Sequence, residues 1–386
     1  MTSCLRFLQC AGFRFDSPFW DGPESWTKFR NQDLWQSFQA VLELCQSEKI
    51  EFLFLTGDLF EQEYVRKETV ERVARSLAKL EGTRVFITPG RRDPLIISSA
   101  YRLTVWPSNV HIFSSGVTSV RIPSHNVTVY GAGWTAYHQE RPFLDSFQPV
   151  NDGTLQLMLL HAMVDSNRNT EGFIPIRHEQ VSSSGLDYLA LGSLEGWSGV
   201  QQAGKTNWAD CGSPEARSFQ DTGPHGVLLG EIQKDSSRFE FRELGQRCYI
   251  EKNFTIQSQS SIEGIAEKII AETSLEERQK NLYRIKLSGN LLDVEEWVQR
   301  LQNLLMTQFR FVTVLPLEER THSQLEFSGL SRQKSMEGFP TLAKIFINKL
   351  QARFVNADKS ESSDYWEIVQ KIGLTALGQG RTVDED

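Results

Sequence analysis

Six charged or ligand-type side chains lie at or just beyond the ends of short apolar segments of this chain. They are Arg14, Asp58, Arg91, Arg92, His161 and Glu195. Carboxylate and imidazole groups bind divalent cations or transfer protons. Arginine stays protonated and offers a planar set of N–H donors that matches phosphate. These residue types therefore suggest metal or phosphate chemistry.

The apolar segments are typical of buried strands, since each is short and is closed by Gly, Pro or Asp. Strands are predicted at residues 5–9, 51–56, 84–88, 155–160 and 188–191, and helices at residues 33–46 and 68–80. Alternating strands and helices favour parallel pairing and a layered α/β fold. The ligand site of such a sheet lies beyond the carboxyl ends of its strands, where these side chains gather.

The motifs at the strand ends resemble those of the calcineurin-like metallophosphoesterases in order and spacing. The family reads Asp-x-His, Gly-Asp, Gly-Asn-His-Asp, an isolated His, then Gly-His-x-His. The matching segments are residues 12–14, 57–58, 90–93, 161 and 192–195. Within the family, the chain is similar to the bacterial SbcD-type DNA repair exonucleases, in a YhaO-like branch. The resemblance implies a layered β-sandwich flanked by helices.

Most positions that hold metal in the family carry other residues here. The seven ligand positions are Gly12, Arg14, Asp58, Arg91, His161, Ser193 and Glu195. Only Asp58 and His161 are unchanged, and the family's catalytic histidine matches Arg92. A two-metal mechanism needs a full set of carboxylate and imidazole ligands, and arginine has no lone pair to offer. We therefore expect a catalytically degenerate, inactive member of the family, with low residual activity left open.

The same substitutions set the cofactor expectation. No metal is expected, or at most one Mn²⁺ or similar ion. The residues that remain suited to hold that ion are Asp58, His161 and Glu195. Such a single site would support a weak Mn-dependent phosphodiesterase or DNA exonuclease.

Two further roles are open for the arginines at the site. In one, they neutralise carboxylates, because a buried charge without a partner is costly. The candidate carboxylates are Asp16, Asp58, Asp93 and Glu195. In the other, Arg14, Arg91 and Arg92 bind a phosphate, so that the protein is a phosphate or nucleotide sensor.

The chain is predicted to divide into four parts. Residues 1–245 form the metallophosphoesterase-like domain, 246–317 a capping domain, 318–340 a linker and 341–386 a C-terminal helical segment. The second part reads strand, helix, strand, helix, strand, a small α/β module that resembles the capping domain of SbcD-type proteins. In that family the C-terminal helices bind the coiled-coil base of an SbcC-like ATPase, which is the partner expected here.

Composition limits the setting in which the protein works. The chain has 386 residues, of which 39% are hydrophobic, enough for substantial cores. No apolar run reaches the roughly 18 residues of a membrane span, so a cytoplasmic protein is expected. The five cysteines show no paired spacing and are expected to be reduced thiols.

The net charge of -8 argues against autonomous DNA binding over a broad basic surface. Any contact with DNA ends would use a local patch or a partner. The function expected from the sequence is a degenerate SbcD-type subunit, a homodimer, that scaffolds or regulates an SbcC-like ATPase at DNA double-strand breaks.

Overall fold

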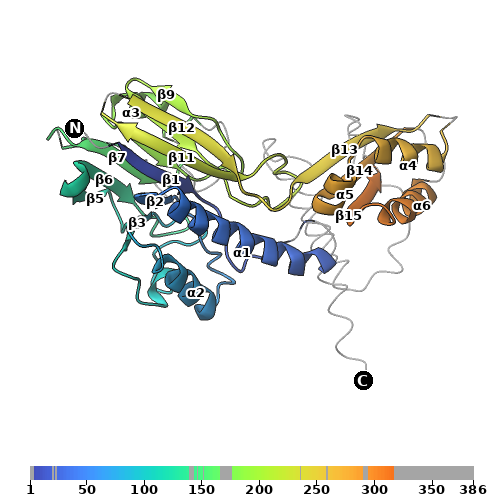
Figure 1. Ribbon diagram of the computed structural model, residues 1–386, viewed down its shortest axis with the longest axis horizontal. Coiled ribbons are helices and arrows are strands. Elements are labelled where there is room, and N and C mark those ends of the chain that lie inside the picture. Colours follow the sequence, from blue (N-terminus) through green and yellow to red (C-terminus); the bar gives the residue numbers. More distant parts are fainter. Residues whose placement is uncertain are drawn as a thin grey trace, which may run out of the picture. The chain divides into compact units, whose positions relative to one another are not determined.

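Two six-stranded sheets are found among the residues that the computed structural model describes (Figure 1). Those residues are 4–19, 21, 24–138, 143–145, 147–150, 152–165, 176–234, 236–257, 260–289 and 294–316. The first sheet has the order β12 (Ser236–Glu243), β11 (Gly226–Gln233), β1 (Leu5–Cys10), β2 (Phe52–Leu55), β3 (Arg84–Ile87) and β4 (Val110–Ile112). The second has the order β5 (Thr118–Ile122), β6 (Val127–Ala132), β7 (Leu155–Leu160), β8 (Tyr188–Leu191), β10 (Thr206–Asp210) and β9 (Gln201–Ala203).

The centre of each sheet is parallel. Strands β1 to β4 pair in parallel, as do β6, β7, β8 and β10, while antiparallel strands lie at the margins. The connections carry helices α1 (Glu24–Ser47), α2 (Lys67–Leu77) and α3 (His178–Ser183), with 3₁₀ turns at Ala100–Arg102 and Pro123–His125. The predicted layered α/β class is confirmed, and so are all five strands predicted in this region.

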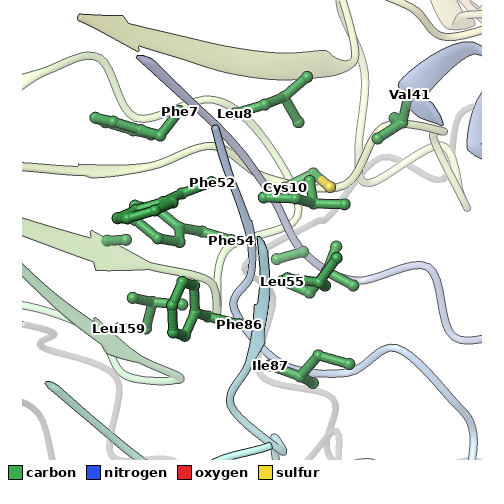
Figure 2. Close-up of a cluster of buried hydrophobic side chains, with 14 of the residues drawn as sticks. Phe7, Leu8, Cys10, Val41, Phe52, Phe54, Leu55, Phe86, Ile87 and Leu159 are labelled. Carbon is green, nitrogen blue, oxygen red and sulfur yellow. The ribbon is translucent and has the colours of Figure 1, made fainter. Parts of the chain in front are cut away.

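The central strands of the first sheet, β1 to β3, are buried on both faces. In Figure 2, alternate residues of β1 to β3 point to opposite sides, with Phe7, Phe54 and Phe86 on one side and Leu8 and Leu55 on the other. The phenylalanine side meets the second sheet, and the other side meets α1. This two-sided burial explains why the strands read as unbroken apolar runs and not as an alternating pattern. Cys10, Cys45 and Cys211 are buried free thiols, as predicted.

A few buried polar side chains in or next to the first sheet donate hydrogen bonds to backbone carbonyl oxygens of the second sheet. The Gln9 amide donates to the carbonyl oxygens of Leu191 and Ala209 at 2.8 and 3.0 Å. The Thr56 hydroxyl donates to the same Leu191 oxygen at 3.0 Å. Because such bonds have fixed geometry, they set the position of β1 and β2 against β8 and β10.

A separate three-stranded parallel sheet follows, made of β13 (Tyr249–Thr255), β14 (Leu282–Ser288) and β15 (Phe311–Pro316). Its helices are α4 (Ile262–Ala271), α5 (Leu275–Lys280) and α6 (Val294–Met306). The predicted strand-helix series is confirmed. Helix α5 was not predicted, because its sequence LEERQK has no apolar periodicity; a capping box formed by Ser274 and Glu277 begins it.

Polar and aromatic contacts join this α/β module to the rest of residues 1–318, which form one compact unit. Arg247 donates to Asp33 at 2.7 Å, and Arg284 donates to Asp21. The aromatic contacts pair Trp26 with Phe311. The boundary at residue 245 stays a prediction. The predicted linker and C-terminal helices lie outside the described residues.

No helix in the described ranges is both long and apolar enough to span a bilayer.

Candidate functional site

The loops that follow the parallel strands of the two sheets meet at one edge of the sandwich. Asp58 follows β2 in the first sheet, and His161 follows β7 in the second. Their side chains face each other, with 3.5 Å between Asp58 Oδ1 and His161 Nε2. Both are buried, with side-chain exposures of 7% and 4%. The structure therefore brings together the two family ligands that the sequence retains.

Glycines make room for this pair. Asp58 has a left-handed backbone (φ 52°), which turns its side chain sharply out of the strand. A Cβ atom on Gly90 would lie 2.4 Å from Asp58 Oδ1, and one on Gly57 would lie 2.3 Å from His161 Nδ1. His161 Nδ1 lies 3.2 Å from the Thr56 carbonyl oxygen, which accepts the Nδ1 proton and directs Nε2 towards Asp58.

Arg14 lies above Asp58 and connects it to Glu195. Its Nε atom lies 3.8 Å from Asp58 Oδ2, and its Nη2 atom donates to Glu195. Burial alone would lower the pKa of Arg14, but the nearby Glu195 and Asp58 carboxylates outweigh that effect and raise it. The predicted pairing of Arg14 with Asp58 and Glu195 is confirmed. Among the described residues, Glu195 and Asp58 are linked by the Arg14 guanidinium, with which each carboxylate pairs. The two carboxylates do not face a common metal position.

Two buried aspartates hold the site loops. Asp93 accepts four backbone N–H groups, from Asp58, Leu59, Phe60 and Gly90, and the Tyr101 hydroxyl. Asp210 does the same in the second sheet, accepting N–H groups from Ser193, Leu194 and Gly212. Burial raises the pKa of each to about 6, with the Asp58 charge adding to the effect at Asp93.

A cleft of about 850 Å³ opens above Arg14. Its charged lining residues are Arg14, Asp21, Glu61, Glu63, Arg92, Glu195, Arg217 and Asp221. The Arg92 side chain is 50% exposed and lies 3.6 Å from Glu61. Burial, reinforced by the neighbouring Arg14 charge, lowers the pKa of Arg217 to about 10. A volume of this size suits a nucleotide-sized ligand, since such pockets measure about 300–1,000 Å³.

The remaining predicted pairings are wrong in detail. Asp16 pairs with Arg66 at 3.2 Å, because its left-handed turn directs it away from the site arginines. Asp93 takes backbone N–H groups in place of an arginine. Arg92 pairs with Glu61, a carboxylate that the motif comparison did not single out.

Three predicted site residues contribute in other ways. Ser193 lines the cleft, while its backbone N–H is held by Asp210. Gly12 has a left-handed backbone (φ 66°) and packs on Ser213, where a Cβ would come within 3.2 Å. Arg91 is half-buried and is not part of the cleft lining. Of the predicted phosphate-binding arginines, the cleft therefore contains Arg14 and Arg92.

Arg217 and Asp210 were missed as site residues. Arg217 donates to the carbonyl oxygens of Phe13 and Ser17, each at 3.1 Å, and so fixes the loop after β1. Asp210 is the last residue of the mostly buried strand β10 and stands two residues before Gly212; an Asp at a strand end beside a Gly is the sequence signal that could have identified it.

The resemblance implies two metal ions, which would need carboxylate and imidazole groups that face a common point. A guanidinium lies between the carboxylates of Asp58 and Glu195, and cationic arginines do not bind metal. Within the described part of the chain, no three His, Cys, Asp or Glu side chains gather as a ligand set. The side chains as placed therefore do not fit a two-metal centre.

Two stacked sheets, with polar loops at their shared strand-end edge, form the scaffold of the site. Sequence comparison finds a metallophosphoesterase that is similar to this chain. The chain is 22% identical over 351 residues to the uncharacterised metallophosphoesterase YhaO of Bacillus subtilis (strain 168), which covers 86% of this chain and 85% of that protein. No protein-family model matches the chain.

Similar solved structures are more distant. TT1561 of Thermus thermophilus is 13% identical with a TM-score of 0.40, over 62% of this chain and 99% of that one. A dimetal phosphatase from Danio rerio is 12% identical with a TM-score of 0.39, over 62% of this chain and 96% of that one.

These comparisons correct two expectations. The prediction of a protein that is not an enzyme is wrong, because the relative that matches most of the chain is named a metallophosphoesterase. The prediction that no metal, or at most one ion, is needed is wrong on the same ground, since the name of that relative specifies a metal. Both predictions equated replaced ligands with lost chemistry. Residue types at motif positions do not by themselves fix where a metal binds.

Proposed function

We propose that this protein is a metal-dependent phosphodiesterase that acts on the end of a nucleic acid or on a nucleotide. The observation that carries the proposal is the Asp58–His161 pair, buried where the two sheets meet below a cleft with exposed arginine. Similarity to YhaO over most of the chain supports the same class of reaction.

The cleft residues supply the phosphate recognition in this proposal. Arg92 presents a half-exposed guanidinium at the mouth of the cleft, where a phosphate can accept two parallel N–H bonds. Arg217 lies deeper and raises the local positive potential, although its own N–H groups already bind the loop after β1. Glu61, Glu63 and Asp221 oppose this charge, so the cleft favours one phosphate at Arg92 over a long anionic strand.

Asp58 and His161 are the reactive residues in this proposal; both are buried, and Asp58 pairs with Arg14, which lines the cleft. Gly90 and the Arg92 N–H, which donates to Asp58 Oδ1 at 2.8 Å, hold the carboxylate in place. The Thr56 carbonyl orients the imidazole. Because the side chains as placed do not fit two ions, no step through a metal is assigned to these residues.

The test is hydrolysis of bis(p-nitrophenyl) phosphate with Mn²⁺ by the natural protein and by Asp58→Asn and His161→Ala variants. Each variant should lose activity by about 100-fold or more, the size of effect typical of catalytic side chains. Arg121→Gln is the matched control, because Arg121 pairs with Asp152 away from the cleft lining and should leave the rate unchanged. Equal rates in the natural protein and both variants would refute the assignment.

We further propose that the biological setting is SbcD-type DNA repair, with an SbcC-like ATPase bound through residues 341–386. Support comes from the motif order and from the amphipathic pattern of that segment, which lies outside the described residues. Deleting residues 326–386 should abolish co-purification with such an ATPase and leave the thermal unfolding midpoint of the remainder unchanged. Retained co-purification would rule out the C-terminal segment as the binding site.

A further inference from the structure

An aromatic residue lines the cleft on the loop that follows β8. Trp197 is half-buried and shares the cleft lining with Arg92, the arginine assigned to phosphate. We propose that Trp197 is the stacking platform for the base of a single nucleotide whose phosphate binds Arg92. This proposal rests on the proposed function and names the residue that selects a nucleotide over other phosphate esters.

The Trp197 ring is held in one orientation by the protein itself. It stacks on Phe241 of β12, with ring centroids 5.0 Å apart and an angle of 16° between the ring planes. The backbone next to it is fixed as well, because the Ser198 N–H and hydroxyl both donate to the Asp210 carbonyl oxygen at 3.0 Å. An aromatic surface fixed in this way loses little conformational entropy when a ligand stacks on it.

The charges of the cleft favour one nucleotide over a strand. Among the lining residues, the carboxylates Asp21, Glu61, Glu63, Glu195 and Asp221 outnumber the arginines Arg14, Arg92 and Arg217. The Arg92 side chain is 50% exposed, whereas those of the other two arginines are largely buried. Further phosphates of a strand would meet the excess of carboxylates and be repelled. A base is uncharged and is bound through its ring face, so the carboxylates do not oppose it.

Tyr64 is a second aromatic residue in the cleft lining and provides an internal comparison. It is 46% exposed, and no ring contact holds its side chain among the residues that the structure describes. A ring that is free to turn must lose rotamer freedom when a base stacks on it. Trp197, already packed on Phe241, is therefore the better platform.

The experiment compares AMP with ribose 5-phosphate, which lacks only the base, by isothermal titration calorimetry on the full chain. The natural protein should bind AMP at least about fivefold more tightly, the effect of stacking one base on an aromatic side chain. Trp197→Leu should bind AMP no more tightly than ribose 5-phosphate, and its affinity for ribose 5-phosphate should match that of the natural protein. Tyr64→Leu is the matched control and should keep the preference for AMP.

A second variant avoids a loss of packing, because Trp197 also packs on the core of the sandwich. Trp197→Phe keeps an aromatic face and should keep the preference for AMP. It removes the indole, so the quenching of tryptophan fluorescence that AMP causes in the natural protein should be lost. Quenching by AMP that persists in Trp197→Phe would show that the base lies elsewhere.

Arg92→Gln tests the phosphate end of the nucleotide. It should weaken AMP and ribose 5-phosphate by the same factor and so keep the ratio of their affinities. The proposal is overturned if the natural protein does not prefer AMP, if the preference survives Trp197→Leu, or if Tyr64→Leu removes it. Hydrolysis of bis(p-nitrophenyl) phosphate involves no nucleobase, so a failure of this proposal leaves the test of Asp58 and His161 unaffected.

Discussion

His161 Nε2 lies 3.5 Å from Asp58 Oδ1, although the two residues end strands in different sheets. Their contact depends on how the sheets are stacked, and not on either sheet alone. Gln9 and Thr56 fix that stacking by donating to backbone carbonyl oxygens of the second sheet. The reactive pair is therefore a property of the whole sandwich.

Gly90→Ala is expected to disturb the site more than the fold elsewhere. The new methyl group would lie 2.4 Å from Asp58 Oδ1 and 2.6 Å from its backbone nitrogen, which cannot move aside cheaply. We expect a loss of about 1–3 kcal/mol in the free energy of unfolding, measured with urea. Gly196→Ala is the control, because its Cβ meets nothing closer than 3.9 Å. Equal stability of the two variants would show that the loop yields.

Tyr101→Phe should destabilise the loop after β3. The hydroxyl donates to Asp93 Oδ2 at 2.6 Å, and its removal leaves a buried carboxylate short of one donor. The expected loss in unfolding free energy is about 1–3 kcal/mol. Because this hydrogen bond lowers the pKa of Asp93, the variant should also raise that pKa above about 6. Tyr137→Phe, at a side chain that is 42% exposed, should change neither quantity.

Asp210 should give the stability a measurable pH dependence. Burial raises its pKa from 3.8 to about 6 in the folded protein. A carboxyl whose pKa is higher in the folded state stabilises that state most at low pH, and the contribution is lost as pH rises through the folded pKa. The loss amounts to about 3 kcal/mol at roughly 1.4 kcal/mol per pKa unit.

The comparison is between the natural protein and Asp210→Asn, by urea unfolding from about pH 4 to about pH 7. Asparagine does not titrate, so the stability advantage of the natural protein should narrow across this window. It should not vanish, because an asparagine NH₂ group cannot accept the N–H groups that both Asp210 oxygens bind. A constant difference across the window would contradict the assignment.

Arg30→Met tests the network beneath the α/β module. Arg30 is fully buried and lies 2.8 Å from Asp33 and 2.7 Å from Glu215. Its removal leaves the buried Glu215 carboxylate without its cationic partner, while Asp33 keeps Arg247; the loss costs about 3–5 kcal/mol of unfolding free energy. Arg300→Met removes an exposed arginine at 3.4 Å from Glu263, and should cost about 1 kcal/mol or less. Similar losses in both variants would mean that the buried network contributes little.

The sequence predicts the strands well because strands buried on both faces have unbroken runs of apolar residues, which strands or helices at the surface do not have. Strands β7 and β8 coincide with their predicted bounds. Helix α1 begins at Glu24, well before the predicted start at residue 33, because Trp26 near its start packs on Phe311 of the α/β module and on Phe219 of the segment between β10 and β11. Contacts between distant segments of this kind leave no local periodic signal.

The site was predictable as a location and only partly as a set of contacts. Motif order places Asp58 and His161 together correctly, since both follow parallel strands. The same order does not reveal that Arg92 turns to Glu61 or that Asp16 turns to Arg66. Those choices depend on left-handed turns and side-chain reach, which spacing in the sequence does not specify.

Asp93 and Asp210 bind the site loops only through backbone N–H groups and one tyrosine hydroxyl. None of these bonds uses a side chain at positions 12, 14, 91, 92, 193 or 195. The shape of the loops is thus independent of the chemical groups that they display. For protein engineering, histidine or asparagine can therefore be introduced at positions 14, 91, 92, 193 and 195 while these loop anchors are kept, whereas Gly12 must stay, because its left-handed backbone and a Cβ 3.2 Å from Ser213 would strain any side chain.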